Sequence, residues 1–296
     1  MNQARFGTAG AGELFYQEGY KHSQEVPEFL HKMGLTAFEY QCGRGVRIGE
    51  EKAKLLGENA VKFDVALSIH APYYISLSTK EPQKIENNLR YFRESAFAAK
   101  MMGATRVVFH PGSVGKGENR KEVFCFAYEA LKHIMYQLNE EGYHEITFCP
   151  ETMGKLNQLG DLEETLAFCK ISENMLPCID FGHLNCRLQG AVAGIEDYQT
   201  IFQRVAEVLG EEKAKRSHVH FSKIEYAKGG EKKHLTFADT TYGPNYEPLM
   251  ELLHRKGYIP TIICESAGTQ AEDAKAMADY AVLAIHEESL FGQNTF

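Results

Sequence analysis

The 296-residue sequence lacks long hydrophobic runs: no stretch approaches the roughly 18 uncharged apolar residues of a membrane-spanning helix. The first residues, MNQARFGTAGAGEL, also lack the basic and then apolar order of a signal peptide. These absences predict a cytoplasmic protein with no membrane partner. Nothing in the sequence indicates an obligate protein partner.

Paired cysteines and an excess of basic residues are missing too. The seven cysteines form neither a CxxC pair nor a dense framework, which favours a reducing compartment. There are 32 Lys and Arg residues against 40 Asp and Glu, a formal charge of -8, which excludes a protein that coats nucleic acid by charge alone. With 44% hydrophobic residues, the composition is that of a globular protein with a large core.

Short apolar runs alternate with segments of helical periodicity, and no low-complexity linker divides them. Runs such as VALSIHA and TIICES are apolar on both faces, as parallel strands covered by helices are. Strands are predicted at residues 5–7, 37–40, 66–70, 106–110, 145–151, 175–180, 217–221 and 260–265. Eight such units predict an α/β protein, a (β/α)8 TIM barrel that forms one domain over residues 1–296. An open doubly wound sheet is disfavoured, because no GxGxxG turn follows the first strand.

Side chains that bind metals close six consecutive predicted strands. Active sites of such barrels lie at the carboxyl ends of the strands. These ends hold His70, His110, Glu151, Asp180, His218 and Glu265, and the following residues add His183, His220, Glu231 and His234. Imidazole and carboxylate ligands without thiolates indicate Zn²⁺ or Mn²⁺, and the number of ligands implies two or three ions. Such ions would outweigh the carboxylates and attract an anionic substrate.

The motifs around these residues are distinctive in order and spacing. They read IHAPYYISL, VVFHPGS, CPETMG, CIDFGHLNC, SHVHFSK and IICES. From the third strand to the eighth, the sequence resembles the endonuclease IV family of apurinic/apyrimidinic endonucleases, within the xylose isomerase-like TIM barrels. The resemblance implies a zinc-dependent phosphodiesterase that repairs damaged double-stranded DNA. It would cleave 5′ to abasic sites by a metal-activated hydroxide.

The resemblance also assigns ligands, with Glu151, Asp180 and Glu265 at the catalytic centre. One ion would bind His70, His110 and Glu151. Glu151 would bridge to a second ion, which is also bound by Asp180, His218 and Glu265. The third ion would bind His183 and the pair Glu231 and His234, where the family has Asp-x-His and this chain has one residue more between the ligands.

Two residues are expected beside the substrate. Tyr73 matches a tyrosine that the family inserts into the duplex, and His220 either completes the third site or packs beside His218. The 24-residue segment 224–247 is long for a barrel loop and is expected to be functional.

Two alternatives remain open. A sugar isomerase or epimerase of the same superfamily would use one Mn, Mg or Co ion on Glu151, Asp180, His218 and Glu265, and would have no use for the extra histidines. A non-catalytic barrel could bind damaged DNA or a phosphorylated sugar without turnover. The number of bound ions separates the two enzymes.

Overall fold

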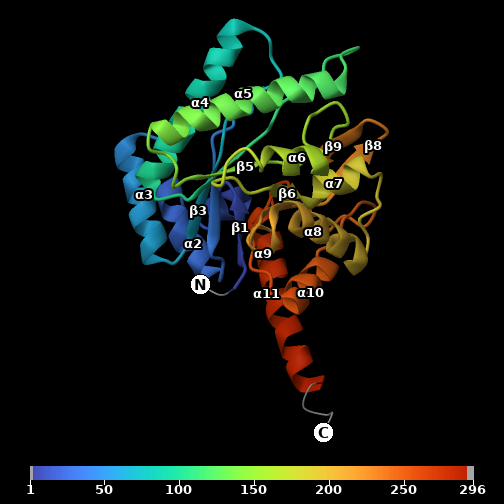
Figure 1. Ribbon diagram of the computed structural model, residues 1–296. Helices are drawn as coiled ribbons and strands as arrows, with labels where there is room; N and C mark the ends of the chain where they lie inside the picture. The colour runs from blue at the N-terminus through green and yellow to red at the C-terminus, as the bar shows by residue number, and fades with distance from the viewer. Residues whose placement is uncertain (1–2, 292–296) are drawn as a thin grey trace.

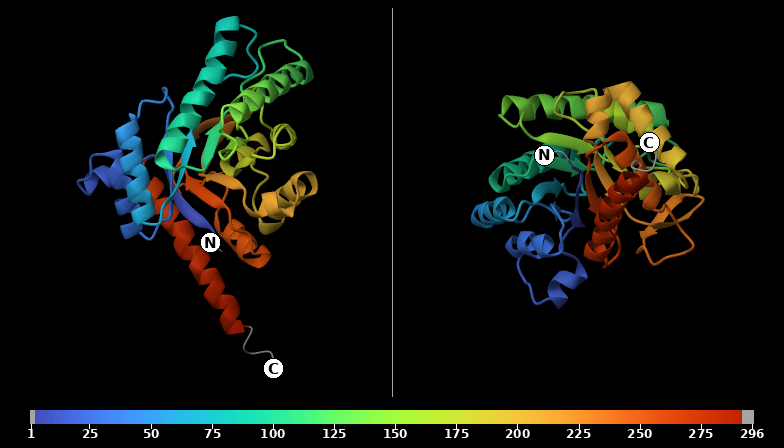
Figure 2. Two further views of the ribbon diagram at one scale, coloured as in Figure 1. Left: turned by 60° about the vertical axis from the view of Figure 1, so that its left-hand side comes forward. Right: turned by 90° about the horizontal axis from the view of Figure 1, so that it is seen from below.

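The computed structural model describes residues 3–291, with side chains as far as Leu283. In this range eight parallel strands form a nearly closed barrel surrounded by helices, which confirms the predicted TIM barrel (Figures 1 and 2). The strands are β1 (Arg5–Ala9), β2 (Ala37–Gln41), β3 (Ala66–His70), β4 (Arg106–Phe109), β5 (Thr147–Pro150), β6 (Cys178–Asp180), β7 (His218–Phe221) and β10 (Thr261–Cys264).

The barrel runs in the order β5-β4-β3-β2-β1-β10-β7-β6. Its two edge strands meet through two isolated parallel bridges, Phe148 with Met175 and Glu151 with Cys178. The second bridge joins Glu151, just past the end of β5, to Cys178, the first residue of β6, two residues before Asp180. Closure of the barrel therefore brings the last residues of all eight strands to one mouth.

Helices cover the outside of the barrel. They are α1 (Gly12–Gln17), the 3₁₀ turn η1 (Ser23–Glu25), α2 (Val26–Lys32), α3 (Glu50–Lys62), α4 (Pro82–Met102), α5 (Arg120–Glu140), α6 (Leu162–Phe168), α7 (Phe181–Arg187), α8 (Ile195–Leu209), α9 (Glu211–Lys215), α10 (Glu247–Lys256) and α11 (Gln270–Phe291). In α5, one stripe is buried, including Val123, Ala127, Leu131 and Leu138. Such spacing of three to four residues turns one apolar face toward the strands.

The segment 224–247 begins with an antiparallel hairpin of β8 (Ile224–Ala227) and β9 (Gly230–His234). Backbone bonds tie this hairpin to the loop after β5, since Leu156 N donates to Gly229 O and Glu231 N donates to Gly154 O. Figure 1 shows the hairpin beside α6 and α7, away from the end of the molecule where α11 projects. The long excursion is thus packed against the loops at the barrel mouth.

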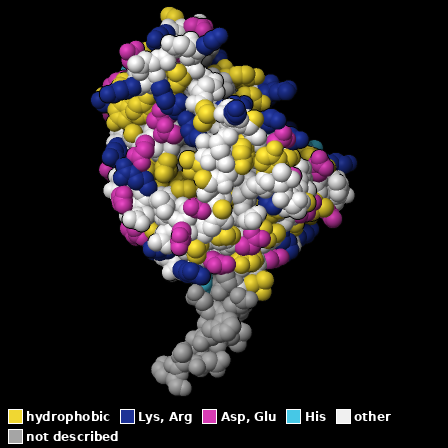
Figure 3. Space-filling view, turned by 90° about the vertical axis from the view of Figure 1, so that its right-hand side faces the viewer, with side chains coloured by type: hydrophobic (Ala, Val, Ile, Leu, Met, Phe, Trp, Pro, Cys, Tyr) yellow, Lys and Arg dark blue, Asp and Glu magenta, His cyan; other side chains and the backbone are white. Residues whose placement is uncertain are grey.

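The surface is mixed in character. On the face shown in Figure 3, Lys and Arg side chains are interspersed with Asp, Glu and hydrophobic ones. Within the described residues, none of the helices is both long and apolar enough to cross a membrane.

Candidate metal centre

The mouth of the barrel holds a cavity of about 380 Å³, lined largely by groups that can bind metals. Its lining includes His70, His110, Glu151, His183, Glu231, His234 and Glu265, together with Tyr73 and Lys155. Three sets of side chains at this mouth place ligand atoms within 4.8 Å of one another. Each set is described below from the strand ends outward.

The first set consists of His70, His110 and Glu151. The Nε2 atoms of His70 and His110 lie 3.2 and 3.1 Å from the same oxygen, Glu151 Oε2. The other ring nitrogen of His70 is 2.9 Å from the carbonyl of Ala71, which fixes the ring with Nε2 toward the mouth. Both rings therefore point at one carboxylate oxygen, as ligands of a shared cation do.

The second set joins Glu151 to Asp180, His220 and Glu265. The other oxygen of Glu151, Oε1, lies 3.6 Å from His220 Nδ1, which is 3.4 Å from Glu265 Oε1. Glu151 thus faces the first set with one oxygen and the second set with the other. This is the arrangement of a carboxylate that bridges two ions.

Several buried polar atoms in this second set have no hydrogen-bond partner among the described residues: Asp180 Oδ2 and both ring nitrogens of His220. Buried polar atoms in native proteins are almost always paired, so such orphans need an explanation. Carboxylate and imidazole atoms that converge without hydrogen bonds fit a divalent cation, and the donor set suits Zn²⁺ or Mn²⁺.

The third set consists of His183, Glu231 and His234. The Nε2 atom of His183 is 3.5 Å from Glu231 Oε2, and His234 Nε2 is 4.0 Å from Glu231 Oε1. The residue inserted between these ligands is accommodated by a β-bulge. Tyr226 pairs with Glu231 and Glu225 pairs with Lys233, so Lys232 has no partner in the ladder. The bulge returns Glu231 and His234 to one face of the hairpin.

Gly154 in the loop after β5 lets this hairpin approach. A Cβ there would lie 2.8 Å from Glu231 Cβ and 2.8 Å from His183 Cδ2, too close for either to remain in place. His183 is fixed from below, because Asp180 caps the N-terminus of α7 by accepting a hydrogen bond from His183 N at 2.7 Å. Two loops and the hairpin thus meet at the third set.

His218 does not join the groups at the mouth. It lies in a separate, buried set with Cys178 and His220, and its Nε2 is 3.0 Å from Glu39 Oε2. Both histidines of β7 point inward because side chains alternate along a strand. His220, one layer nearer the mouth, occupies the position expected for His218.

Glu39, on β2, is a buried residue of the site that sequence reasoning missed. Its carboxylate lies beneath His220, accepts a hydrogen bond from Ser68 Oγ at 2.9 Å and has its two oxygens beside the histidines of β7. A signal was present, since a lone acid in the apolar run TAFEY of a parallel strand must be buried or functional.

The charges of the site are tightly coupled. Burial opposes ionisation of Glu151, but His110 and His220 hold the pKa of its carboxyl well below the usual range. Burial disfavours the charged form of His70, yet Glu151 raises the pKa of that ring to about 9. Burial also disfavours the charged form of His183, but the negative charges of Asp180 and Glu151 raise the pKa of that ring to about 10. Without a metal, these rings therefore hold protons at neutral pH that a bound cation would displace.

Tyr73 lies at the rim of the same cavity, with 53% of its surface exposed. Its backbone N donates to Gly43 O at 3.4 Å, and the ring stands against Gly43, where a Cβ would be 2.3 Å from Tyr73 Cε1. An exposed ring beside the ligands is accessible to a large substrate.

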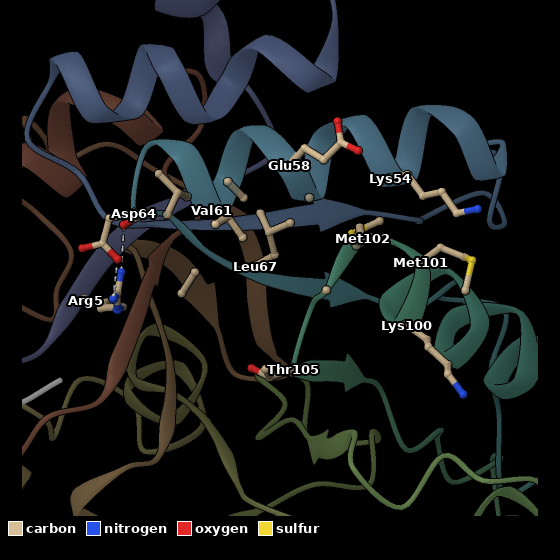
Figure 4. A pocket seen from close by; sticks show the side chains of 15 residues that line it. Arg5, Lys54, Glu58, Val61, Asp64, Leu67, Lys100, Met101, Met102 and Thr105 are labelled. Carbon is tan, nitrogen blue, oxygen red and sulfur yellow. Dashed lines mark hydrogen bonds and ion pairs between the residues drawn. The ribbon is translucent and has the colours of Figure 1, made fainter.

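A larger groove, of about 860 Å³, lies at the opposite end of the barrel between α3 and α4 (Figure 4). Its walls are mainly apolar, including Val61, Leu67 and Met102, and Arg5 pairs there with Asp64 at 2.9 Å. The three ligand sets of the mouth lie at the other end of the barrel.

Comparison with known proteins agrees with this architecture. Residues 27–284 match the model of a family described as xylose isomerase-like TIM barrel. The chain belongs to this family. It is 34% identical over 261 residues to an uncharacterized protein of Methanocaldococcus jannaschii, which covers 88% of this chain and 91% of that one.

The endonuclease IV resemblance is also confirmed, at low identity. A probable endonuclease 4 of Acholeplasma laidlawii is 24% identical over 221 residues, covering 72% of this chain and 71% of the relative. Endonuclease IV from Thermus thermophilus superposes with a TM-score of 0.65 at 19% identity, over 90% of this chain and 94% of that structure. An L-ribulose 3-epimerase superposes with a TM-score of 0.69 at 13% identity, over 99% and 100%. At these identities the two structures show a shared fold only.

Proposed function

We propose that this protein is a metal-dependent phosphodiesterase that cleaves double-stranded DNA on the 5′ side of abasic sites. One observation supports this above the others: three adjoining ligand sets occupy one mouth, and Glu151 belongs to two of them. Three zinc ions fit these sets better than one, and Mn²⁺ could replace zinc in such donors.

When bound, the ions would supply a water nucleophile at neutral pH and neutralise negative charge on the phosphodiester. The chain's own residues hold the geometry. Glu151 ties the first set to the second, while Asp180 and Glu265 complete the second set. Tyr73 is exposed at the rim, and in this proposal it would contact a base or sugar beside the lesion.

Sugar epimerisation is the rival function, and the second set alone could serve it. Glu151, Asp180, His220 and Glu265 form a four-residue site for one ion. That chemistry leaves five side chains at the mouth without a role: His70, His110, His183, Glu231 and His234. The phosphodiesterase proposal uses all of them.

The test is cleavage of a duplex that contains a single abasic site, with zinc-loaded protein and the matched variants Glu265→Gln and His70→Ala. We expect cleavage 5′ to the lesion by the wild type and its loss in both variants. Equal cleavage by all three proteins would contradict the proposal, as would a protein that binds a single ion and epimerises ketoses.

A further inference from the structure

The inside of the barrel contains a polar column just below the mouth. Glu39, Ser68, His218 and His220 are all buried, with relative exposures of 0 to 2%. Glu39 and Ser68 face each other because they are register partners on β2 and β3. Burying a carboxylate costs free energy unless several donors surround it. The residues that contact Glu39 should therefore show what offsets the cost of burying its carboxylate.

The proton positions in this column follow from its donors. Arg106 Nη1 lies 3.3 Å from His218 Nδ1, and a guanidinium can only donate. His218 Nδ1 must then accept, so the ring proton is on Nε2 and is donated to Glu39 Oε2 at 3.0 Å. Both ring nitrogens of His218 are thus engaged in hydrogen bonds with its neighbours. The positive charge of Arg106 also makes the Cys178–His218 side of the column unsuitable for a cation.

The other oxygen of Glu39 is directed at the ligand ring above it. Glu39 Oε1 lies 3.0 Å from His220 Nε2 and accepts from Gln41 Nε2 at 3.2 Å. The opposite nitrogen, His220 Nδ1, faces Glu265 and Glu151 at 3.4 and 3.6 Å. His220 therefore stands between a buried carboxylate below and the second ligand set above.

We propose that Glu39 is a positioning residue of the metal centre, which holds the Nε2–H of His220 so that Nδ1 presents its lone pair to the cation. This rests on the proposed metal site but not on the identity of the substrate. A carboxylate behind a ligating histidine fixes the tautomer and the ring orientation and makes the ligand more basic. Ser68 and His218 hold the carboxylate itself in place. The Nε2 atom of His220 is 3.0 Å from Glu39 Oε1 but is not aligned for a hydrogen bond, and we expect a cation on Nδ1 to bring the ring into line.

The decisive variant is Glu39→Gln, which keeps the shape and removes the charge. Its matched control is Glu164→Gln. Glu164 is another largely buried carboxylate, in the N-terminal turn of α6; it pairs with Arg120 at 2.7 Å and belongs to none of the ligand sets. Zinc affinity is measured by competition with a chelator, and the visible absorption of cobalt-loaded protein reports the coordination.

We expect Glu39→Gln to lower the affinity for one of the bound ions by about 10- to 100-fold and to alter the cobalt spectrum. The control should keep both properties, even if it lowers the melting temperature. Affinity within twofold of the wild type, with an unchanged spectrum, would overturn the proposal. A wild type that binds no divalent ion would instead overturn the proposed function on which it rests.

A measurement on the unaltered chain covers the case in which Glu39→Gln does not fold. Long-range ¹H–¹⁵N spectra of zinc-loaded protein distinguish the two ring nitrogens of His220. We expect a protonated Nε2 and a metal on Nδ1. Zinc on Nε2 would rule out a role for Glu39 behind that ring.

Discussion

The two ends of the barrel differ in opposite directions in the volume of their cavities and in the chemical groups that line them. The groove at the amino end, about 860 Å³, has more than twice the volume of the mouth at the carboxyl end, about 380 Å³. Yet the amino end offers mostly apolar walls, with an ion pair between the largely buried Arg5 and the exposed Asp64. The mouth brings together imidazoles and carboxylates that are buried within reach of one another. From this convergent chemistry, and not from volume, we infer that the mouth is the functional end.

The sharpest contrast between the two ends is expected from Glu151→Gln. Glu151 contacts both His70 and His183 with separate oxygens and serves two ligand sets. Removing its charge should lower cleavage of abasic DNA by more than about 100-fold. Mutating a residue that only contacts a metal ligand costs at most about that much, and Glu151 is itself a candidate ligand. Single-turnover cleavage measures this. A loss of less than tenfold would show that Glu151 does not bridge two ions.

The third ligand set should be separable from the other two through Gly154→Val. The added side chain would clash with Glu231 and His183, which moves the hairpin away. We expect the variant to bind one zinc ion fewer and to fold as the wild type does. Elemental analysis of the purified variant gives the count. If the number of ions is unchanged, the hairpin does not supply ligands.

The pH dependence of metal binding should distinguish the mouth from an ordinary surface site. Because His70 has a pKa of about 9 without metal, a cation must displace its proton below that pH. Affinity at the first set should rise about tenfold per pH unit from 7 to 9 and then level off. Chelator competition across this range measures it. A flat profile would contradict the Glu151–His70 pairing.

The same shift has an opposite consequence for the metal-free fold. The folded pKa of His70 lies above the ordinary value of 6.5, so its pairing with Glu151 stabilises the fold fully below pH 6.5. This stabilisation should be lost as the pH rises toward 9. Urea unfolding of chelator-treated protein should therefore give a lower free energy of unfolding at pH 9 than at pH 6.5 from this pair.

The smallest effect is expected at the amino end. Val61 is 85% exposed in the wall of the groove, and Val61→Ser should change stability by no more than about 0.5 kcal/mol. Zinc content and cleavage should equal those of the wild type. A clear loss of cleavage would mean that the amino end takes part in function after all.

Sequence patterns predicted the barrel well because strands buried on both faces and helices with one apolar stripe leave a clear signature. They also located His70, His110, Glu151, Asp180 and Glu265 at strand ends, which closure of the barrel then gathers. The sequence did not predict how near the mouth each inward-facing side chain lies along its strand. His218 and His220 share one face of β7, and only the stagger between strands decides which of them reaches the mouth.

Glu231, His234 and Glu39 show two further limits. The spacing of Glu231 and His234 could be interpreted only once the bulge at Lys232 was visible, because pairing register is a property of both strands. Glu39 lies in a strand that resembles the endonuclease IV family only in outline, so no motif pointed to it. Its partners on β3 and β7 come from distant parts of the chain.

The central claim is that three cations bind side by side at one end of the barrel. Anomalous diffraction at the zinc edge, from crystals of the zinc-loaded chain, tests it most directly. We expect three peaks: one at His70 and His110, one between Asp180 and Glu265, and one at His183 and His234. A single peak confined to the second set would contradict the claim and favour one-metal sugar chemistry.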